Sequence, residues 1–132
     1  MGMGLDKNAM KNKDITGLII GCSFKVSNTL GCGFVEKVYE KALVYELRKQ
    51  GLQAEAQYPV QVYYDGFIVG EFLIDILVEN CIVVELKALK ALDQNHYAQC
   101  INYLKATKLK TCLLINFGQP RVEHKRIILE NP

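Results

Sequence analysis

The chain lacks the cysteine and histidine patterns that mark common metal-binding folds. None of its five cysteines belongs to a C-x-x-C pair, and neither His96 nor His124 lies at zinc-ligand spacing from a cysteine. The cysteines are also odd in number and scattered. We therefore interpret them as reduced thiols in the core of a cytoplasmic protein. They are Cys22, Cys32, Cys81, Cys100 and Cys112.

Signals for a membrane or for export are also missing. No apolar run approaches the length that spans a bilayer. The N-terminal MGMGLDKNAMKNKD contains no apolar segment of the kind found in signal peptides, and Asp6 stands where a myristoylation motif requires Ser or Thr. These absences predict a soluble, cytoplasmic chain with no membrane partner.

An excess of charge of one sign is absent as well. The formal net charge is only +2, so the chain has no global polycationic signature of tight nucleic-acid binding. Basic residues gather locally instead, in two groups that could line a phosphate-bearing surface or could be ordinary solvated side chains. The groups are Lys105, Lys108 and Lys110, and Arg121, Lys125 and Arg126.

The features that are present fit one globular domain. The 132 residues are 50% hydrophobic and 23% charged, with no internal repeat, low-complexity stretch or linker. This length is sufficient to bury a core. We expect residues 1–13 to be disordered or frayed and residues 14–132 to form a single domain.

Apolar periodicity and turn residues predict eight elements of secondary structure. Helical spacing begins at Asp14, Asp93 is a typical helix N-cap, and Asp65-Gly66 is typical of a tight hairpin turn. The predicted helices cover residues 14–28, 34–50 and 93–107, and the predicted strands cover residues 58–64, 67–78, 81–88, 111–117 and 122–129. The order α-α-β-β-β-α-β-β predicts an α/β (α+β) fold, a mixed sheet flanked by helices.

Two apolar strands carry charged residues where the core of a sheet should have none. Asp75 interrupts FLIDIL, and Glu85 and Lys87 follow directly in IVVELKA. Glu85 and Lys87 share a face of their strand because alternate side chains do so. The polar break Glu79-Asn80 allows a hairpin that brings Asp75 alongside Glu85.

Two adjacent carboxylates repel each other, and burial strengthens the repulsion, so such a pair usually surrounds a cation. An all-oxygen site favours Mg²⁺ or Mn²⁺. With Lys87 placed to hold a phosphate or a water, Asp75 and Glu85 predict a site for phosphodiester hydrolysis. The alternative is a surface ion pair, since many solvated edge strands carry E-x-K. The position of these charges within apolar runs favours the catalytic interpretation.

Two helices offer further candidate side chains. Glu36 and Tyr39 share a face of the second predicted helix, although capping is the better explanation of a carboxylate in the first turn. On the third predicted helix, Gln99 precedes Tyr103 by four residues and His96 lies about one turn earlier. This polar stripe could simply face solvent. Gln99 is the strongest candidate because an amide can both donate to and accept from a phosphate or a metal-bound water.

The motif G-x-x-E-x-x-Y at residues 33–39, within LGCGFVEKVYEKAL, resembles the signature of the GxxExxY proteins, a branch of the PD-(D/E)XK nuclease superfamily. The resemblance continues through GLQAEAQYPVQVYYDG, the Asp75 strand, VVELKAL, the third predicted helix and LLINFG, and covers roughly residues 14–128. The chain has Cys32 where the family often has Pro, which predicts a less stiff loop. It also has Ile74 where the superfamily name implies Pro before the Asp.

The resemblance implies a restriction-endonuclease-like core, a mixed sheet with helices on its faces. It also implies Mg²⁺ or Mn²⁺ held by Asp75, Glu85 and the main-chain carbonyl of Leu86, with Lys87 as the catalytic lysine. The other expected site residues are Glu36, the acidic residue of the leading helix, Gln99, a helper from the helix after the motif, and Tyr39, His96 and Tyr103, which would line the site.

We therefore predict metal-dependent hydrolysis of phosphodiester bonds in nucleic acid, with DNA as the substrate. Two alternatives stay open. The chain could be a nucleic-acid- or protein-binding module that keeps the nuclease fold without turnover, because fold does not imply function. It could also be a structural homodimer in which the charged strand residues form an ion-pair network.

Overall fold

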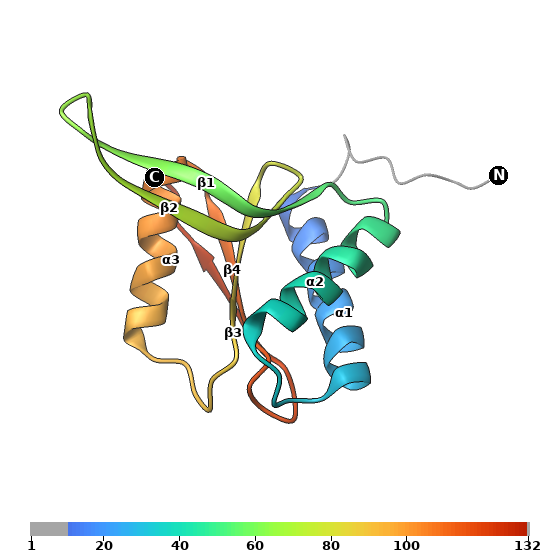
Figure 1. Ribbon diagram of the computed structural model, residues 1–132. Helices are drawn as coiled ribbons and strands as arrows, with labels where there is room; N and C mark the ends of the chain where they lie inside the picture. Colours follow the sequence, from blue (N-terminus) through green and yellow to red (C-terminus); the bar gives the residue numbers. More distant parts are fainter. Residues whose placement is uncertain (1–10, 132) are drawn as a thin grey trace.

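The computed structural model describes residues 11–131. Its elements follow one another in the predicted order α-α-β-β-β-α-β-β, so the predicted fold class is confirmed (Figure 1). The helices are α1 (Asn12–Leu30), α2 (Glu36–Lys49) and α3 (Gln94–Thr107). The strands are β1 (Ala54–Tyr64), β2 (Phe67–Val78), β3 (Ile82–Lys87), β4 (Thr111–Asn116) and β5 (Glu123–Ile128).

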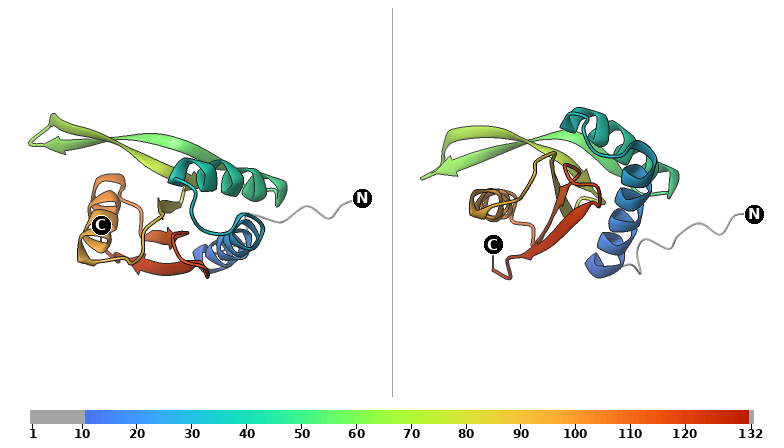
Figure 2. Two further views of the ribbon diagram at one scale, coloured as in Figure 1. Left: turned by 60° about the horizontal axis from the view of Figure 1, so that its bottom comes forward. Right: turned by 90° about the horizontal axis from the view of Figure 1, so that it is seen from below.

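The strands form one mixed sheet in the order β1-β2-β3-β4-β5. Neighbouring strands are antiparallel except for β3 and β4, which are parallel. Parallel neighbours need a crossover connection, and α3 provides it. Figures 1 and 2 show α3 on one face of the sheet and α1 and α2 on the other.

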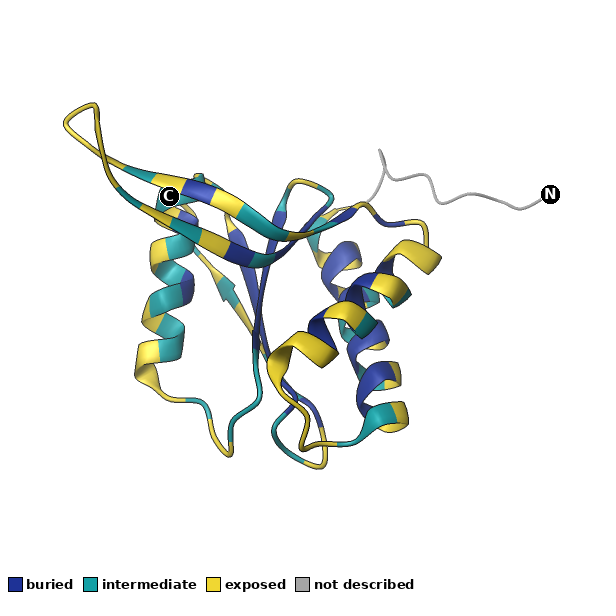
Figure 3. Cartoon of the chain, in the orientation of Figure 1, coloured by how far each residue is buried: buried dark blue, intermediate teal, exposed yellow. Residues whose placement is uncertain are grey.

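Each face of the sheet has its own apolar core (Figure 3). On one face, Ile19 of α1 and Leu43 of α2 belong to the same cluster as Ile115 of β4. On the other face, a smaller cluster joins Leu104 of α3 to Leu114 of β4. The consecutive residues Leu114 and Ile115 serve opposite cores because successive side chains of a strand point to opposite faces.

The outer parts of β1 and β2 extend beyond the rest of the sheet as a two-stranded arm, which we call the hairpin arm (residues 61–73; Figure 1). Its tip is the predicted Asp65-Gly66 turn, in which both residues have positive φ, 52° and 82°, as a type I′ turn requires. Six apolar side chains of the arm are more than half exposed: Tyr63, Tyr64, Phe67, Ile68, Val69 and Leu73.

The element boundaries differ from the predictions mainly at two places. Helix α1 begins at Asn12, so residues 12–13 are helical rather than frayed, and residues 1–10 lie outside the described residues. Strand β1 begins at Ala54, four residues earlier than predicted, because Ala54 pairs with Val78 of β2. That pairing outweighs the weak strand propensity of alanine.

All five cysteines are free, but they are not all in the core. Cys22, Cys100 and Cys112 are buried and Cys81 is half-buried, whereas Cys32 is exposed. The prediction of a core thiol is wrong for Cys32 because it lies in the surface loop between α1 and α2. None of the helices among residues 11–131 is long and apolar enough to cross a bilayer.

Candidate active site

The β2–β3 hairpin brings Asp75 and Glu85 together. The antiparallel ladder ends at the pair Ile76–Val84, and one further step in this register sets Asp75 opposite Glu85. The Leu86 N–H donates a 2.7 Å hydrogen bond to Asp75 Oδ2. This bond fixes the Asp75 carboxylate against β3, so the two acidic side chains lie side by side.

Both carboxyl groups are removed from water, and their pKa values rise accordingly. Burial, together with the negative charge of Asp75, raises the pKa of Glu85 to about 8. Burial also raises the pKa of Asp75, while the hydrogen bond from Leu86 opposes that rise. The two carboxyls are close enough for protonated Glu85 to donate a hydrogen bond to Asp75.

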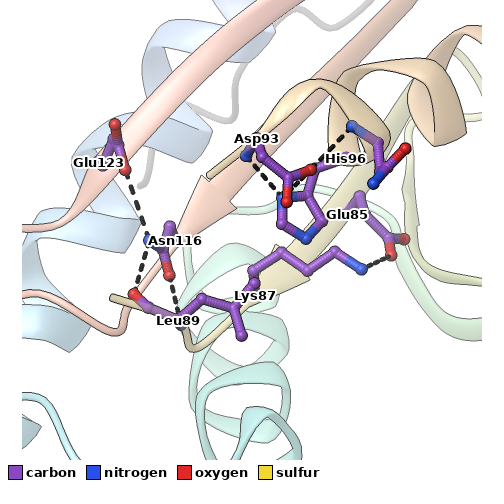
Figure 4. A network of polar contacts seen from close by, with 8 residues as sticks. Glu85, Lys87, Leu89, Asp93, His96, Asn116 and Glu123 are labelled. Carbon is purple, nitrogen blue, oxygen red and sulfur yellow. Dashed lines mark hydrogen bonds and ion pairs between the residues drawn. The ribbon is translucent and has the colours of Figure 1, made fainter. Parts of the chain in front are cut away.

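Lys87 contacts Glu85 on the same face of β3 (Figure 4). Lys87 Nζ lies 3.3 Å from Glu85 Oε2, with the two side chains 18% and 6% exposed. The second carboxylate oxygen, Glu85 Oε1, is buried and has no hydrogen-bond partner among the described residues. An unpaired buried acceptor is unfavourable, so this oxygen is suited to receive a proton or a cation.

The acidic side chain of α2 within electrostatic reach of Asp75 is that of Glu40. Its charge raises the pKa of Asp75, and its Oε1 accepts a 2.6 Å hydrogen bond from Gln57 Nε2. Gln57 interrupts the β1–β2 ladder across from Asp75, between the pairs Ala56–Ile76 and Tyr58–Ile74. It has φ of 54°, a left-handed backbone conformation that is uncommon outside glycine and gathers at functional sites.

The predicted residues Glu36 and Tyr39 lie in different surroundings. Glu36 is exposed in the first turn of α2, and its side chain makes no hydrogen bond or ion pair within residues 11–131. Tyr39 is fully buried. Its ring stacks on Phe117 at 4.6 Å, and its hydroxyl donates a 2.6 Å hydrogen bond to the Gly31 carbonyl. Tyr39 therefore anchors the α1–α2 loop and is not open to a ligand.

Helix α3 supplies Gln99 and Tyr103 on the other side of the carboxylate pair. Gln99 Nε2 donates a 2.7 Å hydrogen bond to Tyr103 Oη, and the Tyr103 ring stacks on Phe72 at 4.5 Å. Burial, and then the negative charges of Glu85 and Asp75, raise the pKa of Tyr103 well above its ordinary value. The phenol therefore lies within electrostatic reach of both carboxylates.

His96 serves the beginning of α3. Its Nδ1 accepts a 2.9 Å hydrogen bond from the Asp93 N–H, and Asp93 Oδ1 accepts one of 2.8 Å from the Asn95 N–H (Figure 4). Together these bonds form a capping box, which satisfies backbone donors at the helix start. Capping thus explains the position of His96, and within residues 11–131 no hydrogen bond or ion pair joins it to the carboxylate pair.

The backbone that carries Lys87 is held by Asn116 at the end of β4 (Figure 4). The Asn116 side chain accepts a hydrogen bond from the Leu89 N–H and donates one to the Leu89 carbonyl, both at 2.9 Å. Gly118 permits the close approach, since a Cβ there would lie 2.2 Å from Leu89 backbone atoms. The Phe117 N–H also donates to the Lys87 carbonyl at 2.8 Å.

The sequence patterns do not single out Glu40, Gln57 or Asn116. Glu40 does carry a readable signal, because it lies three and four residues before the buried Leu43 and Val44 and so falls on the apolar stripe of α2. Asn116 carries a weaker sequence signal, because it is a polar residue at the end of a buried strand. We find no sequence signal for Gln57, whose position depends on the pairing of β1.

The donor set fits a hard divalent cation. Within residues 11–131 no three His, Cys, Asp or Glu side chains form a metal-binding cluster. Mg²⁺, however, usually takes one or two carboxylates and completes its shell with water and substrate phosphate, which Asp75 and Glu85 would allow. The Leu86 carbonyl points to the same strand edge as the Leu86 N–H that binds Asp75, so it offers a third oxygen. The unpaired Glu85 Oε1 is the observation that favours a cation.

A comparison with models of protein families identifies the group to which this arrangement belongs. The model of the PD-(D/E)XK nuclease superfamily matches residues 13–127. The chain belongs to the PD-(D/E)XK nuclease superfamily. The matched range includes the hairpin with Asp75, Glu85 and Lys87 as well as α2 and α3. The narrower GxxExxY branch stays a prediction, as do the substrate, the metal and the homodimer.

A solved structure shares the fold of this chain. The crystal structure of SSO0001 resembles the chain with a TM-score of 0.55 and 18% sequence identity, over 70% of this chain and 50% of SSO0001. The chain thus spans about half the length of SSO0001, and at this identity the likeness shows the fold alone. None of the curated proteins matches the chain.

Proposed function

We propose that this PD-(D/E)XK chain is a metal-dependent nuclease that hydrolyses phosphodiester bonds in DNA. The proposal rests on the buried pair of Asp75 and Glu85, with Lys87 Nζ 3.3 Å from Glu85 and with Glu85 Oε1 unpaired. A buried like-charge pair is unfavourable in the absence of a cation. Its presence in a nuclease fold supports a role in binding a metal ion, and the superfamily supports DNA as the substrate.

Asp75, Glu85 and the main-chain carbonyl of Leu86 would hold Mg²⁺ or Mn²⁺. Such an ion supplies Lewis acidity toward the phosphate and makes water a better nucleophile at neutral pH. The hydrogen bond from the Leu86 N–H keeps the Asp75 carboxylate oriented for this role. The pKa of Glu85, raised to about 8, means that a cation displaces a proton there, so metal affinity should increase with pH.

Lys87 would place a positive charge next to the scissile phosphate. Its ammonium can donate to the attacking water and to a phosphate oxygen, and so offset the charge that develops in the transition state. Because the pKa of Tyr103 is raised, its hydroxyl stays protonated and can donate a hydrogen bond. Gln99 holds Tyr103 through its amide N–H and keeps its carbonyl oxygen available as an acceptor for water.

We assign the acidic role of the leading helices to Glu40, in place of Glu36, because Glu40 is the residue beside Asp75. The bond from Gln57 holds one Glu40 oxygen, and Lys37 lies 3.2 Å from the other. Glu36, exposed one turn earlier, would contact substrate only at the rim of the site.

A nuclease assay with paired variants tests this proposal. Wild type would be incubated with single-stranded, double-stranded and branched DNA and RNA in Mg²⁺, Mn²⁺ or EDTA. We expect cleavage of DNA only with a divalent ion, and we expect Asp75→Asn to abolish it. Glu71→Gln is the matched control, because Glu71 is an exposed carboxylate on the same strand β2. Glu71→Gln should leave the cleavage of single-stranded DNA unchanged.

Two results would reject the proposal. Equal cleavage by wild type and Asp75→Asn would show that the activity does not come from this site. Failure of wild type to cleave any substrate with either ion, combined with metal-independent nucleic-acid binding, would identify a binding module that retains the fold. A titration of the protein with Mn²⁺ separates the cases, since the binding module has no need of a cation at Asp75.

A further inference from the structure

A groove of about 710 Å³ lies between α3 and the hairpin arm. Phe72 forms its wall on the arm, and Gln99 and Tyr103 of α3 line it near the carboxylate pair. Lys105 lines the groove as well. The groove therefore begins at the candidate active site and continues along α3.

A second hollow of about 250 Å³ continues this groove under the arm. Lys105 lines both, and the second hollow adds Tyr63 and Gln61 of β1 and Lys108 at the end of α3. The two hollows together lead from Gln99 and Tyr103 to a pair of lysines. Neither lysine forms an ion pair within residues 11–131, so both charges are available to a ligand.

The lining combines three kinds of chemistry. Ring faces come from Phe72 and Tyr103 and, at the far end, from Tyr63, which is 60% exposed. Amide donors and acceptors come from Asn102 and Gln99 on α3. The cations lie at the far end, and no Asp or Glu is among the described residues that line either hollow.

We infer that this groove binds a single-stranded segment of DNA that flanks the scissile phosphate. The inference rests on the proposed nuclease function and adds the substrate class. Base faces can stack on Tyr63 only where the bases are unpaired, and the lysines can neutralise the phosphates of such a strand. The volume of the groove is in the range of small-ligand sites and suits a short extended chain better than a duplex.

The charge of the arm also favours a single strand over a duplex. Residues 54–78 contain Glu55, Asp65, Glu71 and Asp75 and no Lys or Arg. A duplex laid over the outer face of the arm would bring phosphates toward Asp65 and Glu71, which are exposed. A single strand under the arm meets Lys105 and Lys108 instead. The preferred substrate is therefore DNA with an unpaired flank, such as a flap or an overhang.

Binding measurements in EDTA test the groove without turnover. Fluorescence anisotropy would compare a labelled single-stranded oligonucleotide with the same sequence in a blunt duplex, at several salt concentrations. We expect wild type to prefer the single strand. Lys105→Gln/Lys108→Gln should weaken single-strand binding and reduce the slope of log K against log salt by about 1.4, at about 0.7 per phosphate contact. Tyr63→Ala should weaken it about tenfold, the effect of losing one stacked base.

The matched control is Lys13→Gln/Lys41→Gln, which removes the same charge from α1 and α2 on the opposite face of the sheet and breaks no ion pair within residues 11–131. It should leave the single-strand salt slope unchanged. Equal effects of the two double variants, or equal wild-type affinity for single strand and duplex, would overturn the inference. Cleavage assays distinguish the two proposals. Undiminished cleavage of single-stranded or flapped DNA by Lys105→Gln/Lys108→Gln would reject the groove and leave the nuclease proposal standing. Single-strand binding that depends on the groove residues, without any cleavage by wild type, would reject the nuclease proposal alone.

Discussion

The two faces of the sheet bury different kinds of side chain. The face under α1 and α2 is closed by fully buried apolar residues such as Ile19, Leu43 and Ile115. The face under α3 has a smaller apolar core and also carries Glu85 and Lys87. Two helices cover the first face, whereas one helix leaves room on the second for a carboxylate pair and a groove. The fold thus places most of its stabilising burial on one face, and Glu85, Lys87 and the groove on the other.

The largest expected effect comes from opening a cavity in the apolar face. Ile115→Ala should lower the free energy of unfolding by about 2–5 kcal/mol, because the lost burial and the cavity add together. Val69→Ala, on the exposed arm, should change it by no more than about 0.5 kcal/mol. Urea denaturation of the three proteins measures both values. If Ile115→Ala lowers the free energy of unfolding no more than Val69→Ala does, the face under α1 and α2 does not supply most of the stability.

On the face under α3, the ionisation of Glu85 should make the free energy of unfolding depend on pH. Its pKa is about 8 in the folded chain against an ordinary value of 4.5, so the folded state binds more protons between these limits. Metal-free stability from this group is therefore fully present below pH 4.5 and is lost as the pH rises to about 8. Denaturation in EDTA across this range should show a fall for wild type that is reduced in Glu85→Gln. Parallel curves would contradict the prediction.

Asp75→Asn separates a metal site from a structural ion pair on the same face. At pH values above 8, where Glu85 is ionised, it keeps the shape and removes one of two repelling charges, so metal-free stability should stay level or rise. Wild type should gain about 2.7 kcal/mol at a Mg²⁺ concentration one hundred times its Kd, and the variant should not. Thermal melts with and without Mg²⁺ measure both effects. A structural pair with Lys87 predicts instead a loss of about 3–5 kcal/mol in the metal-free variant and no metal response in wild type.

The smallest effect concerns the support of Lys87. Asn116→Ala leaves the N–H and carbonyl of Leu89 without their partner and should cost about 1–3 kcal/mol. It should also reduce cleavage by more than it reduces metal affinity, because Lys87 moves while Asp75 and Glu85 stay paired across β2 and β3. Mn²⁺ titration and cleavage rates of one preparation test this. Equal losses in both would assign Asn116 to the fold as a whole.

The sequence allowed much of this comparison to be predicted, for a local reason. Charged residues inside the apolar runs around Asp75 and Glu85 identify the hairpin, and the break at Glu79-Asn80 identifies its turn. Both turn residues indeed have positive φ, 52° and 56°. These signals lie within a few residues of one another, so no knowledge of long-range packing is needed to read them.

Local sequence could not show which acidic residue of α2, Glu36 or Glu40, interacts with Asp75. The two residues lie four apart on α2, so local spacing places them on the same helix face. Only the way in which α2 packs beside β1 decides which of them meets Asp75, and this contact runs through Gln57. Tyr39 is buried, and does not line the site, because its ring packs on Phe117. Phe117 lies 78 positions later in the chain, so local sequence could not reveal this contact.

The hairpin arm has a consequence for how copies of the chain behave in solution. Strand β1 is an edge strand, and an exposed apolar edge can pair with another chain. Asp65 and Glu71, with no Lys or Arg in residues 61–73, give every arm the same negative sign. Two arms therefore repel each other, but only over about 8 Å at physiological salt and about 3 Å at 1 M. The protein concentration at which arms begin to associate should therefore depend on ionic strength. At low salt the repulsion between arms should keep the chains apart.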